Sequence, residues 1–340
     1  MLRGKACPEF AEGNAPQHDI AKEDSMTNTP STEDRIWAVI SHLSAIAFGM
    51  GILLPVIGWS EQRRKSSYAS FQCLQALGYQ SLGYTVWILS YLLGMILVLV
   101  IVIVMSFRAG VNGENLDVFS GTWMALIFVV IFGSFALYFL LPVIAAVACA
   151  LGRDFRYPII GNRLARYLGY DPTRVAEESI WLIEDHEDRW VAAMGHFSVI
   201  IAIWGMLAPL AAWIVQGKHS LFLRFQSIQT LVYQIGATLL PFVAMFFCMF
   251  GFFIFVVVTG FGENSSLNSS TGIAGLVILL GSMLIAAGIV MVIPLVHILG
   301  QYAGYRILKG DDYRYPVIGR LVEKRLAQSG SSRSAAIEPE

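Results

Sequence analysis

Two histidines lie in otherwise apolar stretches and are the first candidates for chemistry. His42 stands in "EDRIWAVISHLSAI" and His196 in "EDRWVAAMGHFSVI". Ionisable groups inside a membrane are costly and often functional, so one hypothesis is a paired-histidine site for a proton or a ligand. The favoured alternative is an imidazole that is hydrogen-bonded to a backbone carbonyl, to Gln72 or to Gln75, and that holds helices together.

Six further polar side chains form two equivalent helical faces. Groups three or four residues apart share one side of a helix, and in an apolar helix they must face water, a partner helix or a substrate. A hydrophilic vestibule and a set of hydrogen bonds between helices are equally open hypotheses. The residues are Gln72, Gln75, Tyr79, Gln226, Gln229 and Tyr233.

A second motif couples an acid, an arginine and aromatic residues: "GRDFRYPIIG" at 152–161 and "GDDYRYPVIG" at 310–319. Tyrosine and arginine at the level where a span leaves the bilayer are typical of interfacial anchors. We therefore predict anchors at Arg156, Tyr157, Arg314 and Tyr315. A nest for a lipid phosphate is the less favoured alternative.

Metal and enzyme sites are not indicated. One histidine per copy, with acidic residues two turns away, does not supply the closely spaced ligands of a zinc site. The sequence has no GxSxG, HExxH, Walker or Rossmann pattern in its expected context. We expect no metal, no cofactor and no enzymatic activity.

These residues belong to a long internal repeat. Shifting the chain by 154 positions places Glu187–Gln234 on Glu33–Gln80 without a gap, and 19 of the 48 positions are then identical. The repeat predicts two copies of one structural unit, at 33–165 and 187–325. We expect a disordered tail at 1–32, a cytoplasmic linker at 166–186 and a disordered tail at 326–340.

The composition is that of a membrane protein. The 340 residues are 56% hydrophobic and only 14% charged, against about a quarter charged in soluble domains. Each repeat contains three apolar segments, of which several exceed the roughly 18 residues that indicate a bilayer span. The segments are 36–59, 71–106 and 122–151, then 190–215, 228–259 and 272–305. The lipid bilayer is the expected partner, other membrane protein subunits are candidate partners, and no nucleic acid is expected.

The distribution of Lys and Arg indicates the topology. Six crossings divide these residues 14 to 9, and eight crossings divide them 17 to 6. If the opening segment of each repeat dips in and returns, or lies in the interface, the division is 22 to 1, with Arg108 as the exception. "GMGILLP" at 49–55 and "GMLAP" at 205–209 provide the breaks. We therefore prefer four spans plus two broken opening segments, with both termini cytoplasmic, in the plasma (inner) membrane.

Four motifs that occur in the same order in both repeats resemble a known family. The opening "EDRIWAVISHLSAI", the Gly/Pro break, "FQxxQ" and the closing "YRYP" resemble the Tic-twenty-like bacterial membrane proteins, a group catalogued largely as a domain of unknown function. The resemblance covers about 33–165 and 187–325. It implies a channel-like or translocon-associated role.

The fold prediction is an all-α polytopic membrane protein of two tandem three-segment repeats about a pseudo-twofold axis. The leading functional hypothesis is a non-enzymatic channel-like or translocon-associated subunit. The alternative is a secondary transporter for a small solute, with its site at the broken opening segments. An intramembrane enzyme ranks third.

Overall fold

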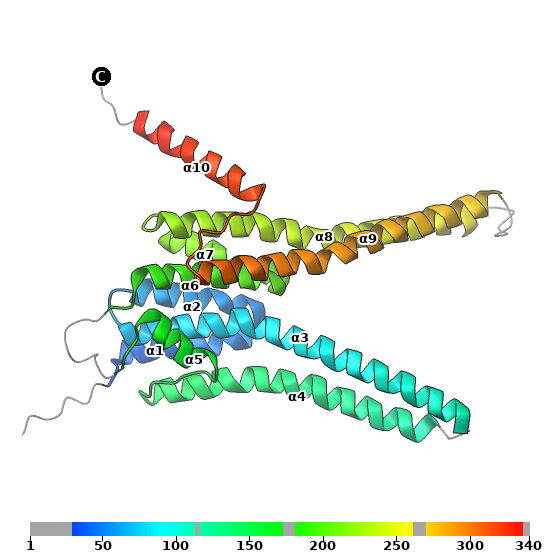
Figure 1. Ribbon diagram of the computed structural model, residues 1–340, viewed down its shortest axis with the longest axis horizontal. Helices are drawn as coiled ribbons and strands as arrows, with labels where there is room; N and C mark the ends of the chain where they lie inside the picture. Colours follow the sequence, from blue (N-terminus) through cyan, green and yellow to red (C-terminus); the bar gives the residue numbers. More distant parts are fainter. Residues whose placement is uncertain (1–28, 113–115, 173–180, 261–269, 336–340) are drawn as a thin grey trace, which may run out of the picture.

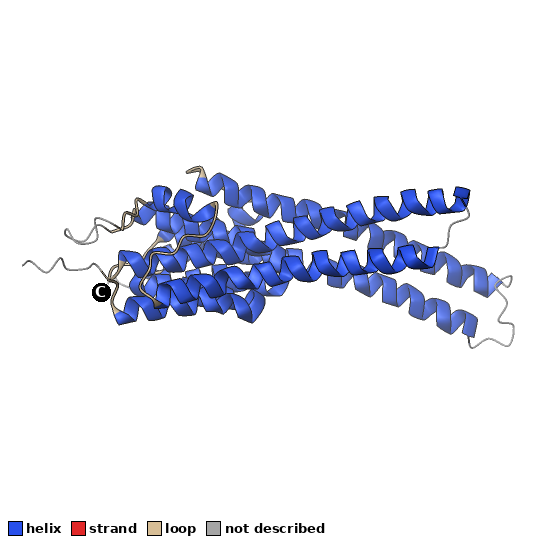
Figure 2. Cartoon of the chain, turned by 90° about the horizontal axis from the view of Figure 1, so that it is seen from below, coloured by secondary structure: helices blue, strands red, loops and turns tan. Residues whose placement is uncertain are grey.

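The computed structural model describes residues 29–112, 116–172, 181–260 and 270–335. Throughout these ranges the regular structure is helical (Figures 1 and 2). Within them, six helical segments are long and apolar enough to cross a membrane. The predicted all-α polytopic fold of two repeats is confirmed.

Each repeat opens with a helical hairpin. In repeat 1 it comprises α1 (Thr32–Leu43), the 3₁₀ segment η1 (Ser44–Ile52) and α2 (Leu53–Gln62). Ser31 and Asp34 close a reciprocal capping box that fixes the start of α1. Nε2 of Gln62 donates a 2.9 Å hydrogen bond to Oε1 of Glu33, so the end of the segment meets its beginning. The opening segment therefore folds back on itself, as a re-entrant topology requires.

Repeat 2 opens in the same way, with α6 (Glu184–Phe197), η2 (Ser198–Met206) and α7 (Leu207–Gln216). The turn requires unusual backbone in both copies: Phe48 and the equivalent Ala202 have φ of 54° and 53°. It also requires glycine. A Cβ on Gly51 would lie 1.8 Å from the carbonyl oxygen of Ser44, and one on Gly205 would meet Ser198 in the same way. The glycines of the two break motifs therefore close the hairpins.

Four long helices carry the rest of the chain: α3 (Ser67–Asn112), α4 (Leu116–Ala150), α8 (Leu221–Gly260) and α9 (Ser270–Leu308). They pair as α3 with α4 and α8 with α9, and both pairs project beyond the hairpins (Figure 1). The 46 residues of α3 would extend about 69 Å, more than twice the hydrocarbon thickness of a bilayer.

Two predicted boundaries differ from the structure. The second apolar segment was predicted to end at 106 and the third to begin at 122, but α3 continues to Asn112 and α4 begins at Leu116. The tail at 326–340 was expected to be disordered, but α10 (Ile318–Ala335) includes its first ten residues. Its counterpart after repeat 1 is the shorter α5 (Ile160–Leu168). Residue propensities predict helix ends that are too early here, because Gly, Ser and Asn are weak helix formers. In the structure these residues continue helices that begin in stronger helix-forming sequence. Residues 1–28 of the predicted N-terminal tail and 173–180 of the linker lie outside the described ranges.

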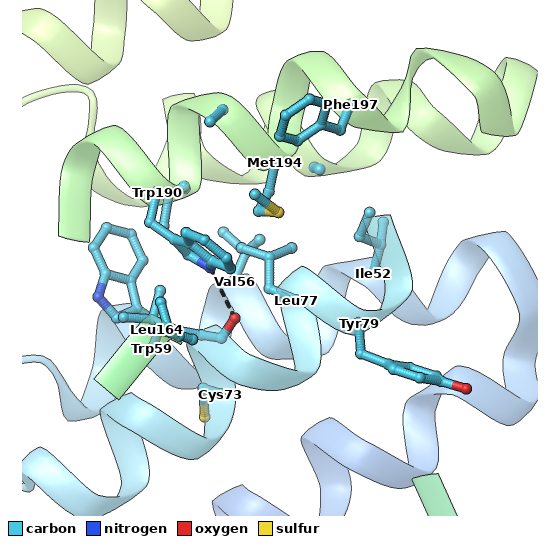
Figure 3. Packing of buried hydrophobic residues seen from close by; sticks show 14 of the residues in the cluster. Ile52, Val56, Trp59, Cys73, Leu77, Tyr79, Leu164, Trp190, Met194 and Phe197 are labelled. Carbon is cyan, nitrogen blue, oxygen red and sulfur yellow. Dashed lines mark hydrogen bonds between the residues drawn. The ribbon is translucent and has the colours of Figure 1, made fainter. Parts of the chain in front are cut away.

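The two repeats meet at one large apolar interface. The equivalent helices α2 and α7 contact each other there, and η1 contacts η2, as a twofold axis between the repeats requires. The axis is approximate, because α3 also packs against α6 and η2. Figure 3 shows Trp190 and Met194 of α6 directed toward the side chains of repeat 1, among them Val56 and Leu77.

Candidate functional site

His42 is enclosed by three elements of repeat 1. Its ring lies on α1, the neighbouring α3 supplies Gln72, and the closing motif after α4 supplies Tyr157. Nδ1 of His42 is 3.0 Å from the Tyr157 hydroxyl, and Nε2 is 3.1 Å from Oε1 of Gln72. Because the amide oxygen can only accept, Nε2 carries the proton and the Tyr157 hydroxyl donates to Nδ1. The favoured hydrogen-bonding interpretation of this histidine fits the geometry.

Gln72 and Gln75 bind the backbone of the closing motif. Nε2 of Gln72 donates to Oδ1 of Asp154 at 2.9 Å and to the carbonyl of Phe155. Gln75 donates to the same carbonyl at 2.9 Å and accepts from the backbone N–H of Tyr157, also at 2.9 Å. The irregular segment 152–159 that follows α4 is here called the strap. The two glutamine side chains supply hydrogen-bond partners for its Phe155 carbonyl and its Tyr157 N–H.

Tyr157 lies inside the protein. Its ring stacks on Tyr79 at 4.3 Å, and the Tyr79 hydroxyl donates to the carbonyl of Tyr138. Only 2% of Tyr157 is exposed, and Tyr315 of repeat 2 is almost equally buried. The predicted interfacial anchors are therefore wrong for both tyrosines, because each hydroxyl is used by a buried histidine. Arg156 and Arg314 do lie at the surface, where each is paired with the aspartate of its own motif.

Repeat 2 repeats the arrangement in detail. His196 is 2.9 Å from the Tyr315 hydroxyl and 3.2 Å from Oε1 of Gln226. Gln226 donates to Asp312 at 2.8 Å, Gln229 donates to the carbonyl of Tyr313, and Tyr233 stacks on Tyr315 at 4.0 Å. Each histidine thus bonds within its own repeat. The residues of these two networks, here called the strap networks, are His42, Gln72, Gln75, Tyr79, Asp154 and Tyr157, and His196, Gln226, Gln229, Tyr233, Asp312 and Tyr315.

The centre of each strap network is buried. His42, Gln72 and Gln75 have no exposed surface, and neither do His196, Gln226 and Gln229. Asp154 lies at the rim, where burial raises the pKa of its carboxyl above the ordinary value and the Arg156 guanidinium 3.2 Å away opposes that rise. In this arrangement the polar groups saturate one another and join helices.

A third polar cluster lies between the repeats. Arg63, at the end of α2, forms ion pairs with Glu187 at 3.0 Å and Asp188 at 2.8 Å on α6. Nε1 of Trp59 donates to the second oxygen of Glu187. Arg63 was not among the residues predicted from the sequence. The repeat pattern is lost at this position, where the equivalent residue is Gly217, and that loss was the available signal.

Across the ranges that the structure describes, there is no group of three or more His, Cys, Asp or Glu side chains placed to hold an ion.

A family model described as the magnetosome magnetite crystal formation protein family, MamF/MmsF, matches residues 33–164 and 187–322. The two matches cover both repeats and more than half of the chain. The chain belongs to this family. The resemblance to Tic-twenty-like proteins was therefore wrong: short shared elements such as a buried histidine, "FQxxQ" and "YRYP" do not separate two families of small helical membrane proteins. No curated protein and no solved structure matches the chain.

The MamF/MmsF ranges coincide with the structural unit. They begin at Glu33 and Glu187, where the hairpins begin, and they end on the helices that follow the closing motifs. Every residue of the strap networks lies within them. This MamF/MmsF protein therefore contains the complete hairpin, helix pair and strap twice in one chain.

Proposed function

We propose that this protein acts in magnetite crystal formation as a non-enzymatic scaffold of the magnetosome membrane. The observation that carries the proposal is the burial of the strap networks within two matched family units. The side chains that could have carried chemistry are used to fix a rigid shape. A protein with such an interior acts through the surfaces it holds in position.

The channel-like or translocon-associated hypothesis and the transporter alternative both need a polar path that water or solute can reach. His42 and His196 were the candidates for such a path, together with the glutamines. All of these histidines and glutamines lack exposed surface, and each has hydrogen-bond partners in its own repeat. This burial favours the scaffold over both alternatives, and it equally disfavours an intramembrane enzyme.

The family favours the magnetosome membrane over the plasma membrane that the sequence analysis expected. We place both termini and the strap networks on the cytoplasmic side. In this orientation the connection from α3 to α4 and the connection from α8 to α9 face the interior of the magnetosome. The support is the 22-to-1 division of Lys and Arg that results when the opening segments turn back.

Deletion of the gene in a magnetite-forming host, followed by complementation, tests the role. Crystal lengths measured by electron microscopy should change on deletion and recover with the wild-type gene. In parallel, the purified protein in liposomes should add no flux of protons or ferrous ions above that of empty liposomes. A flux that His42→Leu and His196→Leu abolish would contradict the scaffold and restore the transporter. Unchanged crystals in the deletion strain would contradict a role in crystal formation.

A further inference from the structure

The helix pair of repeat 1 is open where the pair of repeat 2 is closed. In repeat 2, α8 and α9 approach so closely that a Cβ on Gly251 would lie 1.7 Å from Oγ of Ser282. The equivalent of Gly251, 154 residues earlier, is Leu97, which is 59% exposed. A leucine in place of this glycine does not allow the same close approach of two helices. In Figure 1, α3 and α4 come together at their far ends and separate toward the hairpins.

A cavity of about 400 Å³ lies in this opening, between α3, α4 and the strap. Its walls are mostly apolar and include Val86 and Trp87 of α3, Leu137 of α4 and Ile159 of the strap. The lining residues of α3 and α4 belong to segments that are apolar enough to cross a membrane, so the cavity opens toward lipid. Its volume falls in the range of about 300–1,000 Å³ that is typical of small-molecule sites.

A second cavity lies beside the first. It has a volume of about 350 Å³ and is lined by apolar side chains of α5, α6 and α9, among them Leu164 and Trp190. Leu82, Ile159 and Ile160 line both cavities and therefore form the wall between them. Two neighbouring apolar cavities suit the two acyl chains of one phospholipid.

The wall between the cavities includes strained backbone. Ile159 has a φ of 68°, which a β-branched residue rarely adopts, and it is 77% exposed. The equivalent residue of repeat 2, Val317, is not among the described non-glycine residues with positive φ. The strain is thus specific to the repeat that has the open helix pair. It holds an isoleucine side chain where two acyl chains could cover it.

A positive charge stands at the edge of the second cavity. Arg163 lines this cavity and lies one helical turn after Ile160 on α5. It is exposed, and no acidic side chain in the described ranges forms an ion pair with it. Its counterpart after repeat 2 is the uncharged Leu321. Basic residues where apolar spans end are the groups that attract anionic lipid headgroups.

We propose that repeat 1 binds one anionic phospholipid with two acyl chains, taken from the surrounding bilayer. One chain occupies each cavity, Ile159 lies between the chains, and the phosphate lies at Arg163. The described helices of repeat 2 offer no equivalent site, because their pair is closed and Leu321 replaces the arginine. The duplicated chain therefore carries one lipid site, at the end of the bundle where the strap lies. The proposal is independent of the role in crystal formation.

Native mass spectrometry of the full-length protein tests the headgroup contact. Dioleoyl phosphatidylglycerol is the probe, and dioleoyl phosphatidylcholine is the uncharged control lipid. The wild-type protein should retain one phosphatidylglycerol per chain in preference to phosphatidylcholine. Arg163→Gln should weaken this binding about fivefold, the effect expected of one basic residue on an anionic lipid. Arg320→Gln, at an exposed position on α10, is the matched control and should bind as the wild type does. Equal retention of the two lipids, or wild-type binding by Arg163→Gln, would overturn the proposal.

A bulky substitution tests the first cavity in the same assay. Ser90 lines this cavity and is exposed, so Ser90→Phe should fill the space and abolish the retention of phosphatidylglycerol. Leu93→Phe, at a strongly exposed position on the same helix outside the cavity, should preserve it. The thermal unfolding temperature of each variant monitors its fold. A folded Ser90→Phe protein that still retains the lipid would contradict a site in the cavity, as would equal losses in both variants.

Photochemical labelling locates the lipid. A phosphatidylglycerol with a photoreactive diazirine on one acyl chain should label peptides that contain 79–90, 134–141 and 158–167, as read by mass spectrometry after digestion. The corresponding peptides of repeat 2, at 233–244 and 292–299, should be labelled much less. Equal labelling of both repeats would identify the lipid as part of the general bilayer shell and would overturn the proposal.

Discussion

Nδ1 of His42 and the hydroxyl of Tyr157 lie 3.0 Å apart although 115 residues separate them in the chain. The contact fastens the strap that follows α4 onto the opening hairpin, and it closes repeat 1 into one unit. The same pairing of His196 with Tyr315 closes repeat 2. By its geometry, each of these two buried histidines joins the opening hairpin of its repeat to the strap that closes it.

His42→Leu should lower the free energy of unfolding by about 1–3 kcal/mol, because it leaves the buried Tyr157 hydroxyl without a partner and removes one of the two hydrogen bonds to the amide oxygen of Gln72. His196→Leu should have a similar effect. Thermal unfolding in detergent, followed by circular dichroism, measures both. His297→Leu is the control, since His297 bonds only to the carbonyl of Ile293 in its own helix. Equal effects at all three positions would contradict the strap interpretation.

Gly51→Ala should prevent the hairpin of repeat 1 from closing, at a cost of about 3 kcal/mol or more, because the added methyl group would overlap the carbonyl of Ser44. Gly205→Ala should do the same in repeat 2. Expression level and unfolding temperature are the measurements. Gly281→Ala is the control, since no atom lies within 4 Å of its would-be Cβ. Wild-type stability of Gly51→Ala would show that the turn can rearrange.

Gly78→Val should weaken the packing between the repeats, because the new side chain would displace the indole of Trp190. The expected loss of stability is about 1–3 kcal/mol. Limited proteolysis in the 166–186 linker provides the specific readout, since separated repeats should be cut faster there. Gly236→Ala on α8 is the control, with open space at its Cβ. An unchanged cleavage rate would mean that the interface does not depend on this contact.

The sequence allowed the repeats, the helical hairpins and the apolar spans to be predicted, because all three depend on local periodicity and on residues present in both copies. The partners of His42 among the glutamines were also anticipated. The burial of Tyr157 was missed, since an aromatic residue next to Arg and Pro looks the same at a membrane interface and under a strap. The cluster around Arg63 was missed because ion pairs between repeats depend on how the repeats face each other, which no single-copy pattern reveals.

Arg63→Met should destabilise the protein by about 3–5 kcal/mol, because Glu187 and Asp188 would keep buried carboxylates without their guanidinium partner. Arg64→Met is the matched control: its ion pair with Glu184 is exposed on both sides and should contribute less than about 1 kcal/mol. Unfolding temperatures of the two variants at low and high salt distinguish the buried ion pairs of Arg63 from the exposed ion pair of Arg64. Similar small losses for both variants would contradict a buried cluster.

Stability near the rim of the first strap network should depend on pH through Asp154. Burial raises the pKa of this carboxyl in the folded protein above its ordinary value of 3.8, so between the two pKa values the folded state holds a proton that the unfolded state has released. The free energy of unfolding should therefore fall as the pH rises through this window and level off above it.

Asp154→Asn should remove this part of the pH dependence, since its amide oxygen still accepts from Gln72. Asp312→Asn is the matched variant in repeat 2, where the aspartate side chain is 50% exposed against 22% for Asp154. The measurement is the unfolding temperature of the wild-type protein and of both variants from pH 3 to pH 7. A slope equal to that of the wild-type protein in Asp154→Asn would assign the titration to another group, whereas a smaller slope would identify Asp154 as a carboxyl that the strap holds away from water.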